Sequence, residues 1–319
     1  MDEFKLDFAG IGVAKAGTTW IAKCLGEHPQ VCMARFKETN FFLRSHMSSG
    51  LPGPRAKDAS RYDEGMQWYE ERFALRKPGQ LCGEFSPAYL GDPDCASLLH
   101  AHNPRMKLLC SFRNPVDTAY AAYFQLARVR PLPDTFEEFM ANYPELLEYG
   151  RYDHKLRPFL KLFPHEQVHL MLFEDIRADP AACYRRICEF LKIKTDFVPQ
   201  SLHQKVNPRR VLRSRALRNL RCAVRDIVAS TAPTRRIWSA LVRMGAHRVT
   251  EQVFEWNEMR GTVPPMAPET RRRLVEYYRK ENETLEKLMD RDLSHWSEIR
   301  EEGRAPESRP STMQKSSES

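Results

Sequence analysis

The sequence predicts an α/β protein of three layers, in which a central parallel sheet of four to five strands lies between helices and carries extra helices outside it. Short apolar runs alternate with longer helix-forming segments along most of the 319 residues. This is the order in which parallel strands and crossover helices follow each other. The first apolar run also ends at a glycine-containing turn that leads directly into a helix, a common opening of nucleotide-binding α/β domains.

Four apolar runs mark the expected strands. In chain order they are Phe8–Ala14, Gln80–Phe85, Met106–Arg113 and Gln167–Phe173. The expected helices are Thr18–His28, Pro115 to about Val129, Asp153–Leu162, Ala181–Leu191 and Glu269–Asp290. Pro29 ends the first of these helices, and Pro115 suits the first position of the second.

These elements predict a single domain over residues 1–299, followed by a tail at 300–319. The tail consists mainly of Glu, Ser, Pro, Arg and Lys, and we expect it to be disordered. Residues 44–65 are rich in Gly, Pro, Ser and charge, which indicates a mobile loop near the ligand. Residues 205–250 are expected to form a basic helical insertion, with apolar side chains on one face at Leu217, Leu220 and Val224.

Positive charge is concentrated in residues 205–250. This block holds 12 Lys or Arg and a single acid, Asp226, which gives it +11 and leaves −3 for the rest of a chain whose net charge is +8. Such a block favours an anionic partner, such as phosphates, an acidic acceptor or an anionic membrane surface, although a solvated basic helix pair would have the same composition. A nucleic-acid partner is not expected, because no known nucleic-acid motif is present and few aromatic residues interrupt the block.

The chain has no run of 18 apolar residues, so no transmembrane segment is predicted. Its first residues are acidic where a signal peptide is basic, which favours a cytoplasmic protein unless a targeting segment has been removed. The eight cysteines include no Cys-x-x-Cys pair and no zinc spacing. We therefore expect reduced thiols and no metal site.

The segment Gly12–Trp20, called the glycine loop below, has two glycines separated by four residues, as in a P-loop. A P-loop places lysine after the second glycine, whereas this chain has Thr18 there and a lysine inside the loop, Lys15. Backbone N–H groups at such a helix start can still bind an anion. Lys15 would lie beside the bond that breaks and would stabilise a departing phosphate. A turn that merely joins strand to helix is the alternative.

The glycine loop resembles the 5′-phosphosulfate-binding loop of sulfotransferases that use PAPS (3′-phosphoadenosine 5′-phosphosulfate). The matching residues are Lys-Ala-Gly-Thr-Thr-Trp at 15–20. The similarity continues in the family's order to Trp296, through Lys37–Phe42, Gly83–Tyr89, Ser111–Tyr120, Tyr149–Tyr152, Phe173–Ile176 and Asp292–Trp296. Among branches of the family, the chain is most similar to soluble bacterial enzymes related to heparan-type sulfotransferases.

The resemblance implies PAPS as sulfuryl donor, PAP (adenosine 3′,5′-bisphosphate) as product and no required metal. It implies that the 5′ end of the donor is bound by Lys15, Ala16, Gly17, Thr18, Thr19 and Trp20. Trp20 would either lie against the adenine or pack in the core. The donor's 3′-phosphate is assigned to Arg113, which ends a predicted strand at the edge where ligands bind in open α/β sheets and whose guanidinium suits a phosphate.

The chain departs from the family pattern at Ala121. The family usually has a serine eight residues after the arginine as a second ligand of the 3′-phosphate, and losing that contact would cost about 1–3 kcal/mol if the phosphate oxygen stays unpaired. Arg209 and Arg210 are candidates to compensate, because a later loop of the family closes over this phosphate. Ala121 also leaves open a different nucleotide or a chain without activity.

Glu38 is the candidate general base, because the related branch has a glutamate at this position. The neighbouring Lys37 would favour its ionised form. A plain surface ion pair is the alternative reading of these two residues. Glu84, which follows a strand, could share the role of base or orient the acceptor, and His46 in the predicted mobile loop is a further alternative. Tyr152 is expected to pack.

Together these residues predict transfer of a sulfuryl group from PAPS to a hydroxyl or amine of a small-molecule or glycan acceptor. In-line displacement at sulfur would release PAP. A P-loop kinase would need a lysine after Gly17 and a magnesium-binding acid, which the sequence does not clearly show. A non-catalytic nucleotide- or anion-binding scaffold is the other alternative. Neither the acceptor nor the oligomeric state can be predicted from the sequence.

Overall fold

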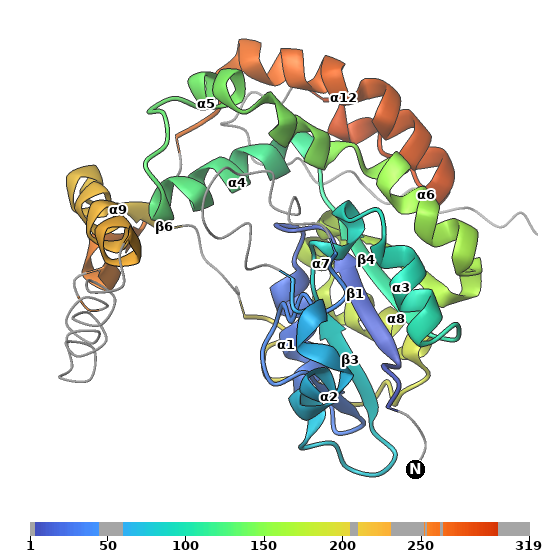
Figure 1. The fold of residues 1–319 in the computed structure, drawn as a ribbon. Helices are drawn as coiled ribbons and strands as arrows, with labels where there is room; N and C mark the ends of the chain where they lie inside the picture. Colours follow the sequence, from blue (N-terminus) through green and yellow to red (C-terminus); the bar gives the residue numbers. More distant parts are fainter. Residues whose placement is uncertain are drawn as a thin grey trace, which may run out of the picture.

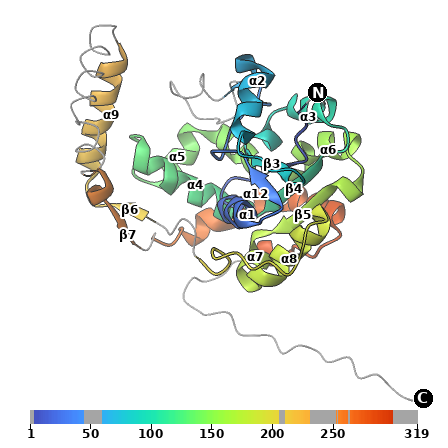
Figure 2. The ribbon, with the colours of Figure 1, turned by 90° about the horizontal axis from the view of Figure 1, so that it is seen from below.

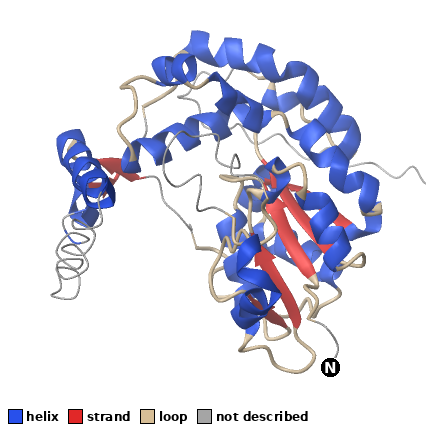
Figure 3. Cartoon of the chain, in the orientation of Figure 1, coloured by secondary structure: helices blue, strands red, loops and turns tan. Residues whose placement is uncertain are grey.

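The computed structural model describes residues 4–44, 60–204, 210–230, 252, 254–261 and 264–298. Its centre is a parallel sheet of five strands in the order β2-β3-β1-β4-β5, drawn in red in Figure 3. The strands are β1 Phe8–Gly12, β2 Val31–Met33, β3 Leu81–Phe85, β4 Lys107–Phe112 and β5 Val168–Leu172. Helices cover both faces, so the predicted α/β fold class is confirmed (Figure 1).

Strand β2 was not predicted, because it is only three residues long. It lies at the edge of the sheet and pairs in parallel with β3, with Val31 opposite Leu81 and Cys32 opposite Cys82. Three residues are too few to show a periodic pattern. The strand nevertheless determines where part of the site lies, because the chain continues from it directly to Lys37 and Glu38 at the carboxyl edge of the sheet.

The five predicted helices form within a few residues of their expected bounds. They are α1 Thr18–Glu27, α4 Pro115–Val129, α6 Tyr152–Leu162, α8 Pro180–Leu191 and α12 Pro268–Met289. Proline opens three of them at the first position, where its missing N–H costs nothing. Four shorter helices are also present: α2 Gly65–Glu70, α3 Cys95–His102, α5 Phe136–Asn142 and α7 Phe173–Ala178.

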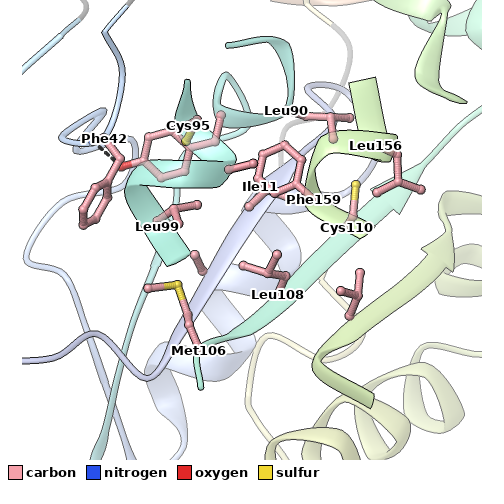
Figure 4. Packing of buried hydrophobic residues seen from close by; sticks show 14 of the residues in the cluster. Ile11, Phe42, Leu90, Cys95, Leu99, Met106, Leu108, Cys110, Leu156 and Phe159 are labelled. Carbon is pink, nitrogen blue, oxygen red and sulfur yellow. Dashed lines mark hydrogen bonds between the residues drawn. The ribbon is translucent and has the colours of Figure 1, made fainter. Parts of the chain in front are cut away.

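Alternate residues of the strands pack into different cores. On one face of the sheet, Ile11, Leu108 and Cys110 contact α3 and α6, and Figure 4 shows this cluster. On the other face, Phe8 and Leu109 pack with α1 and α8. A third cluster joins α4, α5 and α12 beside the sheet. Because both faces are buried, the strands appear in the sequence as continuous apolar runs.

The basic block is only partly helical where the structure describes it. Strand β6, Arg210–Leu212, pairs antiparallel with β7, Glu258–Arg260, and helix α9 spans Arg215–Ser230. Both views place α9 away from the central sheet, at the far end of α4 (Figure 1 and Figure 2). The expected basic helical insertion is therefore helical at α9 but begins with a strand at β6. Residues 205–209, residues 231–250 and the predicted tail at 300–319 lie outside the described residues.

Helix α9 contacts α4 through polar groups and not through the predicted apolar face. The buried side chains are Arg218, whose Nη1 donates to the Ala127 carbonyl at 2.6 Å, and Cys222. Leu220, by contrast, is 60% exposed.

All eight cysteines are buried and none forms a disulfide. Within the described ranges, no helix combines the length and apolarity that a membrane span needs.

Candidate active site

The glycine loop turns sharply after β1. Lys15 and Gly17 both have positive φ angles, 71° and 83°. A Cβ at Gly17 would lie 2.9 Å from Cδ1 of Ile176 and 3.2 Å from Cδ2 of Phe173, both in α7. Both the backbone angle and the lack of space therefore require glycine at this position. Helix α1 begins at the next residue.

The end of β4 holds the glycine loop in place. Val13 N donates to the Ser111 carbonyl at 2.8 Å, and Ser111 Oγ donates to the Ala16 carbonyl at 2.6 Å. Arg113 Nη1 donates to the Lys15 carbonyl at 3.2 Å. Two loop carbonyls are therefore bound by protein donors, whereas the first amides of α1, as at any helix start, have no intrahelical acceptor. This arrangement suits an anion.

Positive charge converges on Lys15. Burial first, and then the charges of Arg128, Arg113 and Lys37, together lower the pKa of its ammonium to about 8. The carboxylate of Glu38 acts in the opposite direction. These groups are therefore close enough to influence one another through space, and the cations outnumber the anion. A bound anion would relieve this repulsion.

Arg113 lies at the carboxyl end of β4. Its guanidinium lies over the Phe173 ring, 4.9 Å from the centroid. The hydroxyl of the buried Tyr152 donates to the Arg113 carbonyl at 3.1 Å, so Tyr152 packs and also fixes this backbone. Asn114 then caps α4 by accepting from Val116 N at 2.9 Å. The strand end and the cap together fix where the arginine leaves the sheet.

Glu38 stands at the same edge of the sheet. Its amide donates to the Phe85 carbonyl at 2.9 Å, which ties the segment after β2 to the end of β3. Lys37 Nζ lies 2.5 Å from Glu38 Oε1. The Glu38 side chain is 52% exposed, so an acceptor can reach it from solvent while the Lys15 side of the site stays partly buried.

Glu84 is placed differently. It belongs to β3 and is 1% exposed. Its carboxylate accepts hydrogen bonds from four hydroxyl groups, those of Thr39, Tyr69, Ser86 and Tyr89. Because these hydroxyl groups enclose the carboxylate, an acceptor cannot contact it in the conformation described. Glu84 can therefore act on the site only through the residues that surround it.

Several side chains of the glycine loop point into the protein. Trp20 packs in the core between α1 and α8, and its Nε1 donates to the Leu202 carbonyl at 3.0 Å. Of the two alternatives for Trp20, the structure favours packing over adenine contact. Ala16 and Thr18 are also buried. These residues can contact a nucleotide only through their backbone atoms. The side chains of Lys15 and Thr19 are half-buried and remain partly accessible.

Comparison with known proteins shows the family of this chain. The model of the sulfotransferase domain family matches residues 7–223, which is more than half of the chain. The chain belongs to the sulfotransferase domain family. The matched range includes β1–β5, the glycine loop, Glu38 and Arg113.

The relatives of this sulfotransferase-family chain include heparan sulfate enzymes. Mouse heparan sulfate glucosamine 3-O-sulfotransferase 3B1 is 28% identical over 193 residues, which cover 58% of this chain and 45% of the relative. Mouse heparan sulfate glucosamine 3-O-sulfotransferase 5 is 26% identical over 195 residues, covering 57% and 52%. The chain thus spans about half the length of these curated relatives.

A solved structure shares the fold. The crystal structure of a sulfotransferase from Alicyclobacillus acidocaldarius superposes with a TM-score of 0.66 at 24% identity, covering 92% of this chain and 100% of that one.

One residue near the site of this sulfotransferase-family chain was missed by the sequence reasoning. Arg128, in the last turn of α4, acts on the pKa of Lys15 and binds both carboxylate oxygens of Glu258 in β7 at 2.6 Å. It also lines a cavity of about 210 Å³ between α4 and β6. The spacing in the sequence could have identified Arg128. It follows Ala121 by seven residues and therefore lies on the same face of the helix.

Three predicted residues cannot be placed in the site. Arg209 and His46 lie outside the described residues, and Arg210 begins β6 with a side chain that is likewise not described. In the part of the chain that the structure describes, no group of three His, Cys, Asp or Glu side chains is arranged to hold a metal ion.

Proposed function

We propose that this chain transfers the sulfuryl group of PAPS to a hydroxyl or amine of an acceptor and releases PAP. The proposal rests on the position of Lys15, Arg113 and Glu38 at the carboxyl edge of one parallel sheet. The charges of Arg113 and Glu38 both act on the pKa of Lys15. Lys15 and Arg113 are cations suited to the donor's phosphates, and Glu38 is an exposed carboxylate. Membership of the sulfotransferase family supports the same chemistry.

The proposed reaction is an in-line displacement. An acceptor oxygen or nitrogen forms a bond to sulfur while the bond between sulfur and the bridging oxygen of the 5′-phosphate breaks, and the electron pair stays on that phosphate oxygen. Lys15 and the first amides of α1 stabilise the charge that develops there. Glu38 takes the proton that the acceptor loses.

The other end of the donor is assigned to Arg113. Its guanidinium forms two parallel hydrogen bonds with a phosphate more readily than an ammonium would. Ala121 offers no hydroxyl for this phosphate. We propose that cations from elsewhere contribute instead, with Arg209 and Arg210 as the predicted candidates and Arg128 as a further one, since Arg128 already lies near Lys15.

The acceptor class stays broad: a small molecule or a glycan. Three arginines and one acid line the cavity between α4 and β6, namely Arg128, Arg215, Arg218 and Asp134. Arg128 and Arg215 are paired with Glu258 and Asp134, and the described part of the basic block adds further arginines along α9. This charge favours an acidic acceptor. We further propose that residues 1–299 form one domain that works in the cytoplasm, and that the charge of 205–250 suits contact with an anionic membrane surface.

A calorimetric titration tests the donor. PAP is expected to bind without magnesium, at least about tenfold more tightly than ATP, because two separate cations, Lys15 and Arg113, match its two phosphate ends. Adding magnesium is expected to leave PAP binding unchanged. A chain that binds ATP and magnesium but not PAP would overturn the proposed function in favour of a kinase. Binding of PAP without any transfer would favour a nucleotide-binding scaffold.

The pKa of Lys15 predicts how donor binding varies with pH. Because this pKa is about 8 in the free protein, the lysine is charged below pH 8, and a bound polyanion would raise its pKa. Affinity for PAP is therefore expected to fall by no more than about twofold between pH 7 and 8. Above pH 8 it should fall by up to about tenfold per pH unit, because binding must then take up a proton.

Fluorescence or calorimetric titrations from pH 7 to 9.5 measure this dependence. The matched control is Lys15→Arg, whose guanidinium stays charged across the range, so its affinity should not vary with pH. If the wild-type chain and Lys15→Arg show the same flat profile, Lys15 does not contact the donor.

A further inference from the structure

The buried carboxylate of Glu84 is surrounded by hydroxyl groups. Oε1 accepts from Tyr89 at 2.6 Å and from Tyr69 at 2.7 Å, while Oε2 accepts from Ser86 at 2.9 Å and from Thr39. We call these four residues the hydroxyl ring. Among the described residues, every hydrogen-bond donor to Glu84 belongs to this ring. Two donors to each oxygen match the lone pairs of an ionised carboxylate.

Three members of the hydroxyl ring also accept a backbone amide from residues 38–42, which we call the base loop. The pairs are Asn40 N with Ser86 Oγ at 3.1 Å, Phe42 N with Tyr89 OH at 3.3 Å, and Phe41 N with Thr39 Oγ1 at 3.4 Å. A hydroxyl has one proton. When that proton is directed at Glu84, the lone pairs remain free to accept from the loop amides, so the carboxylate orients the three hydroxyl groups as acceptors.

The base loop needs such support because its backbone is unusual. Glu38 has a φ of 64° and Asn40 a φ of 53°. Asparagine tolerates this region, whereas a glutamate adopts it uncommonly and needs support from its surroundings. The Glu38 amide is held by the Phe85 carbonyl. Ser86 and Tyr89 of the hydroxyl ring hold the amides of Asn40 and Phe42, while Phe41 N donates to Thr39 within the base loop itself. The conformation that presents Glu38 to solvent therefore depends on contacts made by β3 and the segment after it.

We propose that Glu84 is a positioning residue for the reaction: through the hydroxyl ring it fixes the base loop and so directs Glu38 at the acceptor. This inference rests on the proposed function, because it takes Glu38 as the base. It departs from the sequence-based expectation that Glu84 shares the proton transfer or touches the acceptor. Burial raises the pKa of the Glu84 carboxyl, and the four hydroxyl donors oppose that rise.

The first test is Glu84→Gln. The amide nitrogen donates where the carboxylate accepted, so two of the hydroxyls lose their acceptor and must turn away. We expect kcat to fall about 10- to 50-fold, while the KM for the donor and the dissociation constant of PAP change less than about threefold. A positioning role moves kcat alone, whereas general damage to the domain would also weaken PAP binding.

A double-variant cycle links the effect to Glu38. If Glu84 acts only through Glu38, adding Glu84→Gln to Glu38→Gln should lower the rate no further than Glu38→Gln alone. Independent, multiplying effects would overturn the inference, and so would an unchanged kcat in Glu84→Gln.

A matched pair of conservative variants keeps the inference falsifiable if Glu84→Gln does not fold. Tyr69→Phe and Tyr89→Phe each remove one hydroxyl that donates to Glu84, but among the described contacts only the Tyr89 hydroxyl also holds a base-loop amide. The kcat of Tyr89→Phe should fall at least about fivefold further than that of Tyr69→Phe, with similar thermal stability. Equal losses of kcat would overturn the positioning role.

The same assays separate this inference from the proposed function. Transfer by the wild-type chain together with loss of transfer in Glu38→Gln would uphold the proposed function, and the Glu84 variants then decide the inference alone. If the wild-type chain transfers no sulfuryl group, or if Glu38→Gln stays active, the inference fails together with the assignment on which it rests.

Discussion

Replacing Glu38 by Gln is expected to lower kcat by about 10²- to 10⁴-fold, the usual range for removing a general base. The amide keeps the shape of the side chain and can still accept from Lys37 Nζ, which lies 2.5 Å from Oε1 in the native chain. It cannot take a proton from the acceptor. PAP affinity should stay within about threefold of the native value, because Lys15 and Arg113 are unchanged.

Steady-state kinetics with PAPS and an acceptor, together with PAP calorimetry, measure both quantities. Glu269→Gln is the matched control: Glu269 is an exposed glutamate that pairs with Arg272 at 3.3 Å, as Glu38 pairs with Lys37, but it belongs to the first turn of α12. It should retain full activity. If Glu38→Gln turns over at the native rate, the base lies elsewhere, with His46 the remaining alternative.

The fold could be predicted because its signals are local. Buried parallel strands appear as uninterrupted apolar runs, and proline fixes helix starts such as Pro115 within one residue. Strand β2 shows where this stops: Val-Cys-Met has no pattern of its own and becomes a strand only because β3 offers it an edge. Strand β6 lies in a run of arginines and pairs with a segment about 50 residues away, so its pairing is a tertiary effect.

The site could be predicted less completely, and the reason is burial. Judged by residue type and position after a strand alone, Glu38 and Glu84 are both candidates for the general base. Only the packing around them distinguishes an exposed carboxylate from one enclosed by four hydroxyls. Trp20 likewise fits a nucleotide site or a core until its hydrogen bond to Leu202 is known. Arg128 was missed because its effect on the pKa of Lys15 depends on the direction in which α4 leaves the end of β4.

Replacing Arg113 by Ala is expected to weaken PAP binding by about 10²- to 10³-fold. A bidentate pair with the 3′-phosphate consists of two charge-assisted hydrogen bonds, each contributing about 1.5 kcal/mol or more. The arginine also has an internal role, because its Nη1 donates to the Lys15 carbonyl at 3.2 Å. Loss of affinity alone therefore does not distinguish direct phosphate binding from a disturbed glycine loop.

Comparing PAP with adenosine 5′-phosphate makes that distinction, because the second ligand lacks only the 3′-phosphate. If Arg113 binds that phosphate, Arg113→Ala should abolish the preference for PAP and leave the affinity for adenosine 5′-phosphate within about threefold. If it acts through the loop, both ligands should weaken equally. Arg157→Ala, on the surface of α6 where Arg157 pairs with Asp153 at 3.8 Å, is the control and should change neither affinity.

Because Ala121 supplies no hydroxyl, the native chain should depend on Arg113 more strongly than a chain with serine at that position. Ala121→Ser combined with Arg113→Ala should therefore recover part of the lost preference, and no recovery would place the 3′-phosphate away from this face of α4.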